Sequence, residues 1–178
     1  IKRKQDGLMS AHLHQHLRVG SVLTLSQAEG EFVLPASNNL PGKILLLSAG
    51  SGSSPVMSLL RDLHEQEYAG DVVFLHVCRD AGEYAFAEQL PLIAAEMPGL
   101  NVVTHFTAAQ GRLDARALLA TVPDLAERAT WLCGPSAWME QVHALRAEQG
   151  FTSTLTSERF GGAPVIPPAV ISRPPTAE

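Results

Sequence analysis

The stretch AGSGSSP at residues 49–55 has the residue types and spacing of a phosphate-binding turn. Gly50 and Gly52 remove the Cβ atoms that would keep a phosphate away from the backbone, and glycine permits positive φ. We expect Ser54 to cap the following helix and Pro55 to occupy its first position, so that N–H groups face an anion. A larger residue at Gly52 should then block the phosphate and leave the fold largely intact. The alternative is a tight structural turn without a ligand.

Two other glycine-rich motifs do not fit this spacing. A Walker-type phosphate loop needs Gly, four residues and then Gly-Lys-Ser/Thr, and no lysine follows here. A nucleophile elbow needs Gly-x-Ser-x-Gly, which Gly50 to Ser54 does not supply. The sequence therefore disfavours a nucleoside triphosphatase and a serine hydrolase.

A second stretch whose residue types could take part in chemistry is WLCGPSAWMEQV at residues 131–142. Cys133 ends a short apolar run, and Gly134-Pro135 opens a helical pattern with another bare backbone. A free cysteine is more often a small buried residue than a reactive one. The interest of Cys133 lies in its position, because both turns would face one crevice if they shared a sheet edge.

The elements that must position these turns are alternating strands and helices. Four short apolar runs predict strands that are covered on both faces, at residues 43–49, 71–78, 100–106 and 129–134. Helical patterns lie between or after them, at residues 55–67, 85–97 and 136–149, and a fifth strand pattern follows Gly150 at 151–160. This alternation predicts an α/β fold with a doubly wound, parallel, five-stranded sheet of Rossmann-like type. Ligands of such sheets bind beyond the carboxyl ends of the strands.

The two ends of the chain differ from this pattern. Residues 18–34 alternate and contain two glycines, which predicts two antiparallel strands from the end of a small barrel. We therefore expect a barrel part at residues 1–40 and a sheet domain at 41–160. A proline-rich tail or linker should follow at 161–178. The chain begins without methionine, and we expect it to be a fragment.

Composition limits the classes of partner. A net charge of −5, with 46% hydrophobic and 17% charged residues, describes a globular chain without a basic surface for nucleic acid. Two distant cysteines indicate neither a disulfide framework nor a zinc site, which fits a reducing cytoplasm. No apolar stretch is long enough for membrane insertion. His12 and His16 are one helical turn apart, but no third ligand follows, so we expect no metal site.

Four segments occur in an order and spacing that resemble ferredoxin-NADP reductase-like flavoproteins, including the reductase components of oxygenases and desaturases. They are LLLSAGSGSSPVMSLLRDL, HVCRDAGEYAFAEQL, WLCGPSAWMEQV and SERF. The upstream stretch DGLMSAHLHQHLRVGSVLTLSQAEGEFVLP looks like the last part of the flavin-binding barrel of that family. The resemblance thus covers residues 1–160. It is closest to reductases with a plant-type [2Fe-2S] domain after ERF, and this chain contains no cysteine-rich cluster motif.

The resemblance implies an oxidoreductase that passes a hydride from NADPH or NADH to FAD. Single electrons would then go to an iron-sulfur or other acceptor protein, such as a ferredoxin, oxygenase or desaturase. Cys133 and Glu158 would be the catalytic residues. The implied cofactor-binding residues are Gly50, Ser51, Gly52 and Ser53 for the nucleotide pyrophosphate, Gly134 and Pro135 beside the nicotinamide, Phe160 near the flavin, and Gly7, Met9 and Ser10 for the flavin pyrophosphate.

One part of the family pattern is absent from the chain. The Arg-x-Tyr-Ser-type motif that holds the flavin is expected upstream of Ile1. The alternative function is therefore a pyridine-nucleotide-binding module that is inactive in isolation because its flavin site is incomplete. A dehydrogenase that acts directly on a small substrate lacks support, since no Tyr-x-x-x-Lys pair occurs.

Dinucleotide choice depends on the residues that follow the second strand. Arg79 is suited to the 2′-phosphate of NADPH, whereas Asp80 is suited to the ribose hydroxyls of NADH. Arg79 comes first after the strand, which favours NADPH slightly. Tyr84 is a candidate for stacking on adenine, or for packing at the start of a helix.

Overall fold

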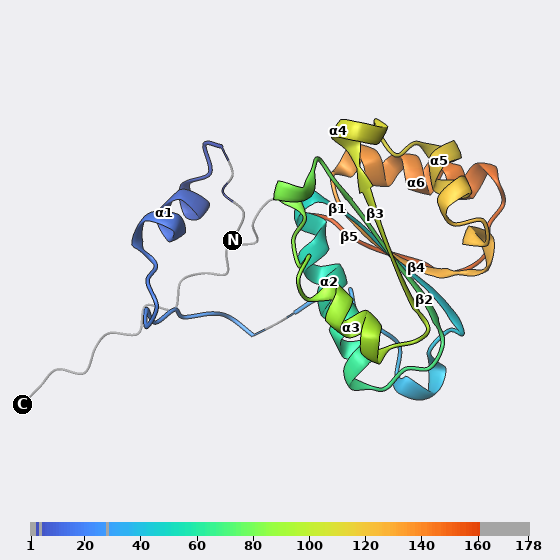
Figure 1. The fold of residues 1–178 in the computed structure, drawn as a ribbon, viewed down its shortest axis with the longest axis horizontal. Coiled ribbons are helices and arrows are strands. Elements are labelled where there is room, and N and C mark those ends of the chain that lie inside the picture. The colour runs from blue at the N-terminus through green and yellow to red at the C-terminus, as the bar shows by residue number, and fades with distance from the viewer. Residues whose placement is uncertain (1–2, 4, 28, 161–178) are drawn as a thin grey trace, which may run out of the picture.

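A parallel five-stranded sheet forms the centre of the molecule in a computed structural model that describes residues 3, 5–27 and 29–160 (Figure 1). The strand order is β3-β2-β1-β4-β5. The strands are β1 (Lys43–Ala49), β2 (Asp71–Cys78), β3 (Leu100–Phe106), β4 (Ala129–Cys133) and β5 (Leu155–Glu158). The chain order reverses between β1 and β4, so the switch point lies where the two bare turns leave the sheet. The predicted doubly wound α/β sheet is confirmed.

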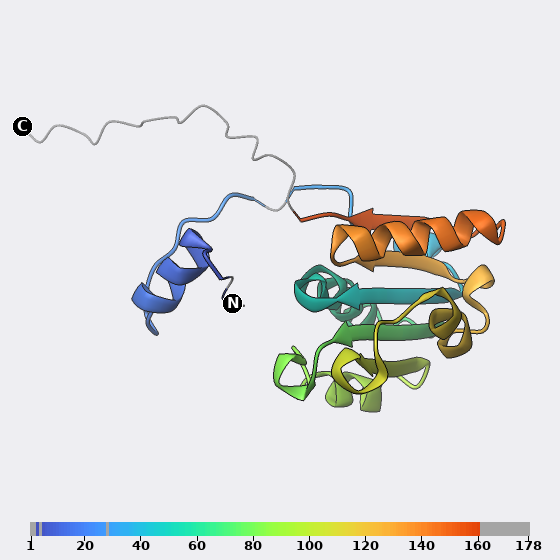
Figure 2. The same ribbon diagram turned by 90° about the horizontal axis from the view of Figure 1, so that it is seen from above.

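Helices cover both faces of the sheet (Figures 1 and 2). These helices are α2 (Ser53–Glu65), α3 (Leu90–Glu96), α4 (Thr107–Gln110), α5 (Ala115–Thr121) and α6 (Ser136–Glu148), whereas α1 (Leu8–His16) lies apart from the sheet. One face packs against α2 and α3, and the other packs against α5 and α6. Ile44 and Leu46 of β1 point to the first face, and Leu45 and Leu47 point to the second. This two-sided burial explains the continuous apolar run of the strand.

The predicted antiparallel strands at residues 18–34 are wrong. The described residues of this segment form no strand. Burial alternates only at the end of the segment, where Phe32 and Leu34 pack against the core while Val33 between them is 61% exposed; residues 18–27, 29 and 30 are all exposed. A strand also needs a neighbouring backbone to pair with, and the described chain places none beside this segment. Figure 2 shows α1 and the residues that follow it away from the sheet.

Several element boundaries differ from the predicted ones because local hydrogen bonds decide them. The helix predicted at residues 85–97 begins at Leu90, after a 3₁₀ turn at Ala81–Glu83 in which Asp80 Oδ1 accepts from the Gly82 N–H. The strand predicted at 151–160 is limited to β5, since the Phe151 N–H bonds to the Arg146 carbonyl instead of joining the sheet. Helix α5 was missed, although Asp114 before an alanine- and leucine-rich stretch is a capping signal.

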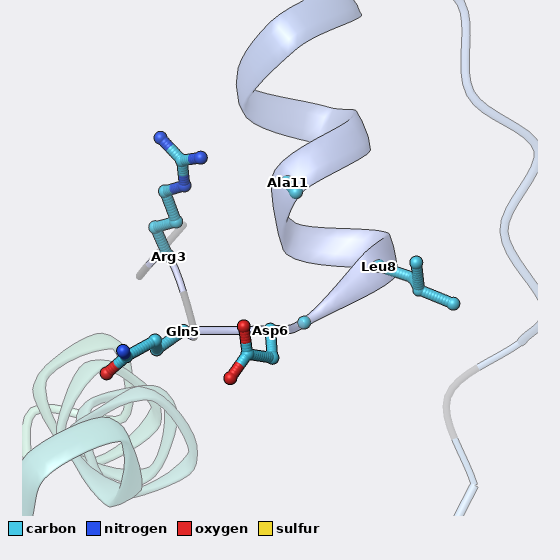
Figure 3. A pocket seen from close by; sticks show the side chains of 6 residues that line it. Arg3, Gln5, Asp6, Leu8 and Ala11 are labelled. Atoms are coloured by element: carbon cyan, nitrogen blue, oxygen red, sulfur yellow. The ribbon is translucent and has the colours of Figure 1, made fainter.

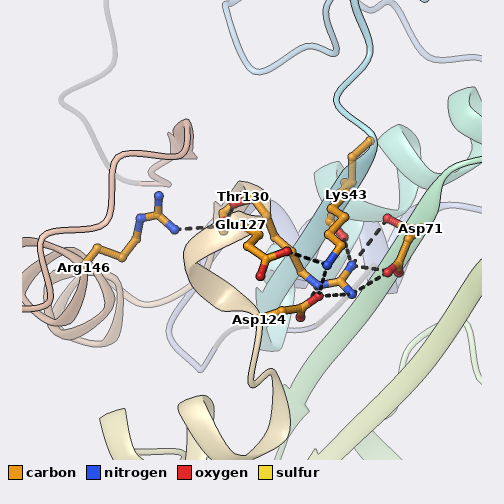
Figure 4. A network of polar contacts seen from close by, with 8 residues as sticks. Lys43, Asp71, Asp124, Glu127, Thr130 and Arg146 are labelled. Carbon is orange, nitrogen blue, oxygen red and sulfur yellow. Dashed lines mark hydrogen bonds and ion pairs between the residues drawn. The ribbon is translucent and has the colours of Figure 1, made fainter.

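A polar network ties the amino ends of three strands together, far from the two turns (Figure 4). Arg128, directly before β4, donates to both carboxylate oxygens of Asp71 at 2.9 and 2.7 Å. It also donates to both oxygens of Asp124, at 2.7 and 2.9 Å. Lys43 Nζ lies 3.0 Å from Asp124 and 2.6 Å from Glu127. This network is structural, because it lies at the end of the sheet opposite the carboxyl ends of the strands.

The proline-rich tail predicted at residues 161–178 lies outside the described residues. Across the part of the chain that is described, none of the helices combines the length and the hydropathy needed to cross a membrane.

Candidate functional site

The first turn of the candidate site runs directly from β1 into α2. Gly50 has φ +56, a conformation that glycine permits and that other residues rarely adopt. A 3₁₀ turn over Gly50–Gly52 then continues into α2 without a break, so that Gly52 is the N-cap residue. The predicted cap at Ser54 is wrong, and Pro55 is the third helical residue, because this turn begins the helix two residues early. No side chain in the described chain caps α2.

The sequence predicts that Gly52 lets a phosphate approach the backbone, but the structure gives this glycine a different role. Its φ is an ordinary −62, and it is buried. A Cβ atom built on it would lie 2.1 Å from the Cys133 carbonyl oxygen and 2.8 Å from the Gly134 nitrogen. The expectation that a larger residue leaves the fold intact is therefore wrong. The absent side chain instead allows the two turns to touch through their backbones.

The second turn, Gly134-Pro135, also exposes backbone without a large side chain. A Cβ atom on Gly134 would lie 2.9 Å from the Trp138 ring and 3.0 Å from Ala49 Cβ, so glycine is needed for close packing here too. Pro135 is the N-cap residue of α6, and no side chain of the described residues caps that helix. Trp138 packs against the core beside this turn.

The two turns and the starts of α2 and α6 surround a cavity of about 400 Å³. Most of its lining residues have small side chains or none: Ala49, Gly50, Ser51, Gly134, Pro135 and Ser136. The larger side chains of Arg3 and Phe160 complete the lining. Neither α2 nor α6 has an acidic residue in its first turn. Both helices are 13 residues long, so their dipoles place partial positive charge at this cavity. The crevice therefore fits an anionic ligand that approaches the backbone closely.

Cys133 is the last residue of β4, at the carboxyl edge of the sheet. Its side chain is fully buried and its register partners are Ser48 of β1 and Glu158 of β5. Burial, and secondarily the charge of Glu158, raises the pKa of the thiol to about 11. The thiol is therefore protonated at neutral pH, which excludes a thiolate nucleophile in this state.

A row of polar side chains crosses the sheet at the same level and was missed from the sequence. Thr104, His76, Ser48, Cys133 and Glu158 occupy successive register positions on the five strands. Ser48 Oγ lies 2.8 Å from His76 Nδ1, and both residues are buried. The predicted strand ends do not identify this row, because Ser48 and Cys133 lie one residue before theirs and the other members lie two residues before theirs.

The row also bears on the role of Tyr84. The Tyr84 ring stacks on His76 with centroids 5.9 Å apart, and Phe106 meets it edge to face at 6.1 Å. Tyr84 thus has packing partners on the protein itself.

Arg79 and Asp80 follow β2 at the same edge of the sheet. The Arg79 side chain is 74% exposed, and its Nε atom lies 3.8 Å from Asp80 Oδ2. The Asp80 carboxylate is already engaged by the Gly82 N–H at 2.9 Å. Arg79 is thus the more available of the two side chains for a phosphate.

The residues expected to hold the flavin pyrophosphate lie at the start of α1. Gly7 is the N-cap residue, Ser10 donates its hydroxyl to the Gly7 carbonyl at 3.1 Å, and Met9 is 69% exposed. Of these three, Gly7 lines a depression of about 580 Å³, which Figure 3 shows between Arg3, Asp6 and Ala11. Arg3 lines both this depression and the crevice between the turns. Figures 1 and 2 show α1 apart from the sheet, so the structure does not bring Gly7, Met9 and Ser10 into the crevice.

Glu158 and Phe160 lie beside a second cavity of about 530 Å³, between α2 and residues 29–34. Its apolar lining includes Phe32, Val33, Leu34, Pro55 and Leu59. Phe160 is 55% exposed and also borders the crevice between the turns. The structure thus brings the expected nicotinamide and flavin residues of the sheet domain to neighbouring cavities.

His12 and His16 have ring centroids 4.5 Å apart, and no group of three metal-binding side chains occurs among the described residues.

Comparisons with known proteins agree with this geometry. Residues 46–144, more than half of the chain, match the oxidoreductase NAD-binding domain family. An NADPH oxidoreductase of Mycobacterium tuberculosis is 38% identical over 167 residues, covering 94% of this chain and 43% of that protein. A glycine betaine monooxygenase reductase subunit of Chromohalobacter salexigens is 32% identical, covering 92% of this chain and 47% of that protein. This chain spans less than half the length of either relative.

Solved structures show the same fold. The FAD/NAD-binding domain of a nitric oxide dioxygenase from Vibrio cholerae superposes with a TM-score of 0.65 at 26% identity, over 88% of this chain and 65% of that one. Ferredoxin-NADP⁺ reductase from Plasmodium falciparum shares the fold with a TM-score of 0.67 at 15% identity, over 86% of this chain and 67% of that one. The relatives are named as oxidoreductases, so a module without redox function is not favoured. The chain belongs to the oxidoreductase NAD-binding domain family, within the ferredoxin-NADP reductase-like proteins.

Proposed function

We propose that this chain binds NADPH in the crevice between its two bare turns and presents the nicotinamide for hydride transfer to FAD. The observation that carries the proposal is the backbone contact between Gly52 and Cys133, which joins two uncapped helix starts into one anion-attracting cavity. The pyrophosphate would lie against Gly50 and Ser51, whose backbone is open to that cavity. Ser53 contributes through its backbone position alone, because its side chain is 2% exposed.

The nicotinamide would lie over the end of β4. Gly134 and Pro135 border the crevice there, and Cys133, whose neutral thiol is buried in the core, directly precedes Gly134. A small, protonated side chain at this position lets the ring approach the sheet edge without placing a charge next to it. Cys133 would orient the ring by packing and as a weak S–H donor.

The flavin ring would lie in the neighbouring cavity beside Glu158 and Phe160. When bound, FAD accepts a hydride and passes electrons singly to an acceptor protein. The apolar lining excludes water from that side, and Phe160 borders both cavities, so its ring can pack between the two cofactors. Gly7, Met9 and Ser10 would receive the flavin pyrophosphate at the start of α1.

NADPH is the proposed dinucleotide because Arg79 is exposed while Asp80 is engaged by Gly82. The Mycobacterium tuberculosis relative is named an NADPH oxidoreductase, which supports this preference. The proposed acceptor is an iron-sulfur protein, oxygenase or desaturase. Any [2Fe-2S] centre of that path would lie outside this chain, since its two cysteines are both buried. Two free cysteines also support a cytoplasmic location.

Calorimetric titration with NADPH and with NADH, each with and without FAD, tests the proposal. We expect NADPH to bind more tightly than NADH, and Arg79→Ala to remove about tenfold of that preference, the size of a charge-assisted contact of about 1.4 kcal/mol. Failure of a folded chain to bind either nucleotide, with or without FAD, would refute the proposal. Nucleotide binding without any FAD binding would indicate a nucleotide-binding module instead.

A further inference from the structure

Trp131 connects the sheet to the segment that precedes it. It lies in the middle of β4 and is 2% exposed. Its indole N–H donates to the Val33 carbonyl at 3.0 Å, across 98 positions of sequence. Phe32 and Leu34, on either side of Val33, pack their side chains against the same core cluster that contains Trp131. The hydrogen bond therefore fixes the distance between this extended segment and the face of the sheet.

A second aromatic side chain holds the same segment further along. The Tyr68 hydroxyl donates to the Pro41 carbonyl, directly before β1 begins. This second tether lies at the amino ends of the strands, because Pro41 is two residues before Lys43. The Asp71 N–H also donates to the Gly42 carbonyl, at 3.0 Å and at the same end of the sheet. Of these three contacts to residues 32–42, the Trp131 tether is the one near the proposed cofactor cavities.

The Trp131 tether is placed to set the geometry between those cavities. Trp131 precedes Cys133 by two residues on the same face of β4. The segment it holds forms one wall of the cavity that Glu158 and Phe160 border. Residues 3–27 that can be described, including the start of α1, connect to the sheet through this segment. A shift of Val33 would therefore move the flavin side relative to the nicotinamide side.

We propose that Trp131 is a positioning residue for hydride transfer, which acts by holding residues 32–34 at a fixed distance from the end of β4. This inference rests on the proposed function. Hydride transfer is sensitive to the separation of the reacting atoms, and a displacement of about 1 Å can cost on the order of 100-fold in rate. Trp131 itself touches neither the crevice nor the second cavity according to their lining residues.

The test compares Trp131→Phe with Tyr68→Phe in the 178-residue chain. Each variant keeps an aromatic ring and removes one donor to a carbonyl of the connecting segment. The first readout is amide hydrogen exchange, which needs no cofactor. We expect Trp131→Phe to speed exchange about tenfold at the Val33 amide, which donates to the Glu31 carbonyl at 2.9 Å, and Tyr68→Phe to act only at the Asn39 amide, which donates to the Ala36 carbonyl at 2.7 Å, as expected for loss of one local constraint.

The second readout separates binding from transfer. We expect both variants to bind NADPH within about twofold of the parent chain, since neither residue lines the crevice. Hydride transfer to bound FAD, followed by flavin absorbance, should fall about 10- to 100-fold in Trp131→Phe and less than about twofold in Tyr68→Phe. Equal rate losses in the two variants, or an unchanged rate in Trp131→Phe, would overturn the inference.

Two further outcomes are distinguishable. If Trp131→Phe fails to fold, Leu34→Ala releases the same segment from the other side, and an unchanged transfer rate in that variant would overturn the inference. If the parent chain transfers no hydride, the proposed function fails and the positioning role falls with it. The exchange data would then still report whether the tether exists.

Discussion

At the scale of single residues, Gly52 joins the two turns of the site because no side chain separates its Cα from the Cys133 carbonyl. The contact is to backbone atoms of β4, which cannot rotate away as a flexible side chain would. The bare turn therefore has a packing function that is independent of any ligand. Gly50 differs, since its positive φ is required but nothing lies within 4 Å of an added Cβ.

Gly52→Ala is expected to destabilise the fold by about 1–3 kcal/mol, the usual cost of overpacking a tight contact. Urea unfolding followed by circular dichroism measures it. Gly42→Ala is the matched control, because Gly42 has ordinary φ and open space around its Cα. A Gly52→Ala variant as stable as the control would show that the two turns do not touch in solution.

Cys133→Ala is expected to lower hydride transfer to FAD more than it lowers NADPH affinity, because the buried thiol is at the end of β4, where the nicotinamide is proposed to lie, and Cys133 is not among the residues that line the crevice. Stopped-flow absorbance and calorimetry give the two quantities. Cys78→Ala removes the other buried thiol and serves as the control. Equal losses of rate and affinity would assign Cys133 to packing.

At the scale of elements, the sheet has a distinct task at each end. The carboxyl ends of β1 and β4 present bare backbone to the crevice, whereas the amino ends of β1 and β2 and the residues before β4 are tied by Arg128. The buried guanidinium of Arg128, 5% exposed, needs its carboxylate partners to offset desolvation. Disruption of this network would shift the register between β1, β2 and β4. The two turns at the opposite end of the sheet would then no longer be aligned.

The network makes stability depend on pH through Asp124. Hydrogen bonds from Arg128, and further from Lys43, lower the pKa of Asp124 from 3.8 to about 2. A lowered folded-state pKa adds stability that is fully present above about pH 4 and is lost as pH falls through about 2. We expect Asp124→Asn to cost about 1–2 kcal/mol at pH 7 and to flatten the pH dependence between pH 4 and 2. Unfolding curves measured across this range check it, and an unchanged slope would contradict the expectation.

At the scale of the whole molecule, the sheet domain and the segment before it are held together by few contacts. The hydrophobic core draws on residues from Phe32 to Leu155, and none of its members comes from α1. Leu8, Met9 and several later apolar residues are more than half exposed. Arg3, which precedes α1, lines both the depression at the start of that helix and the crevice between the turns.

Removal of residues 1–30 is therefore expected to leave the sheet domain folded, with a melting temperature within about 4 °C of the parent chain, which corresponds to less than about 1 kcal/mol. Differential scanning calorimetry measures the shift. NADPH binding should remain, and any effect of added FAD on that binding should disappear. A shortened chain that fails to fold would show that α1 and its neighbours contribute to the core.

The sequence by itself was sufficient for the sheet and for both turns. Strands buried on two faces read as continuous apolar runs, and glycine-rich ends of such strands indicate a ligand edge, so β1 to β4 and the turns at Gly50 and Gly134 could be predicted. The tertiary structure decided how these parts meet. Residues 18–34 alternate like a strand in sequence yet pair with none, because the described ones before Glu31 are exposed and no described strand lies in register with them. The reason for Gly52, the row from Thr104 to Glu158 and the Trp131 tether all depend on contacts between segments far apart in sequence, which local periodicity does not record.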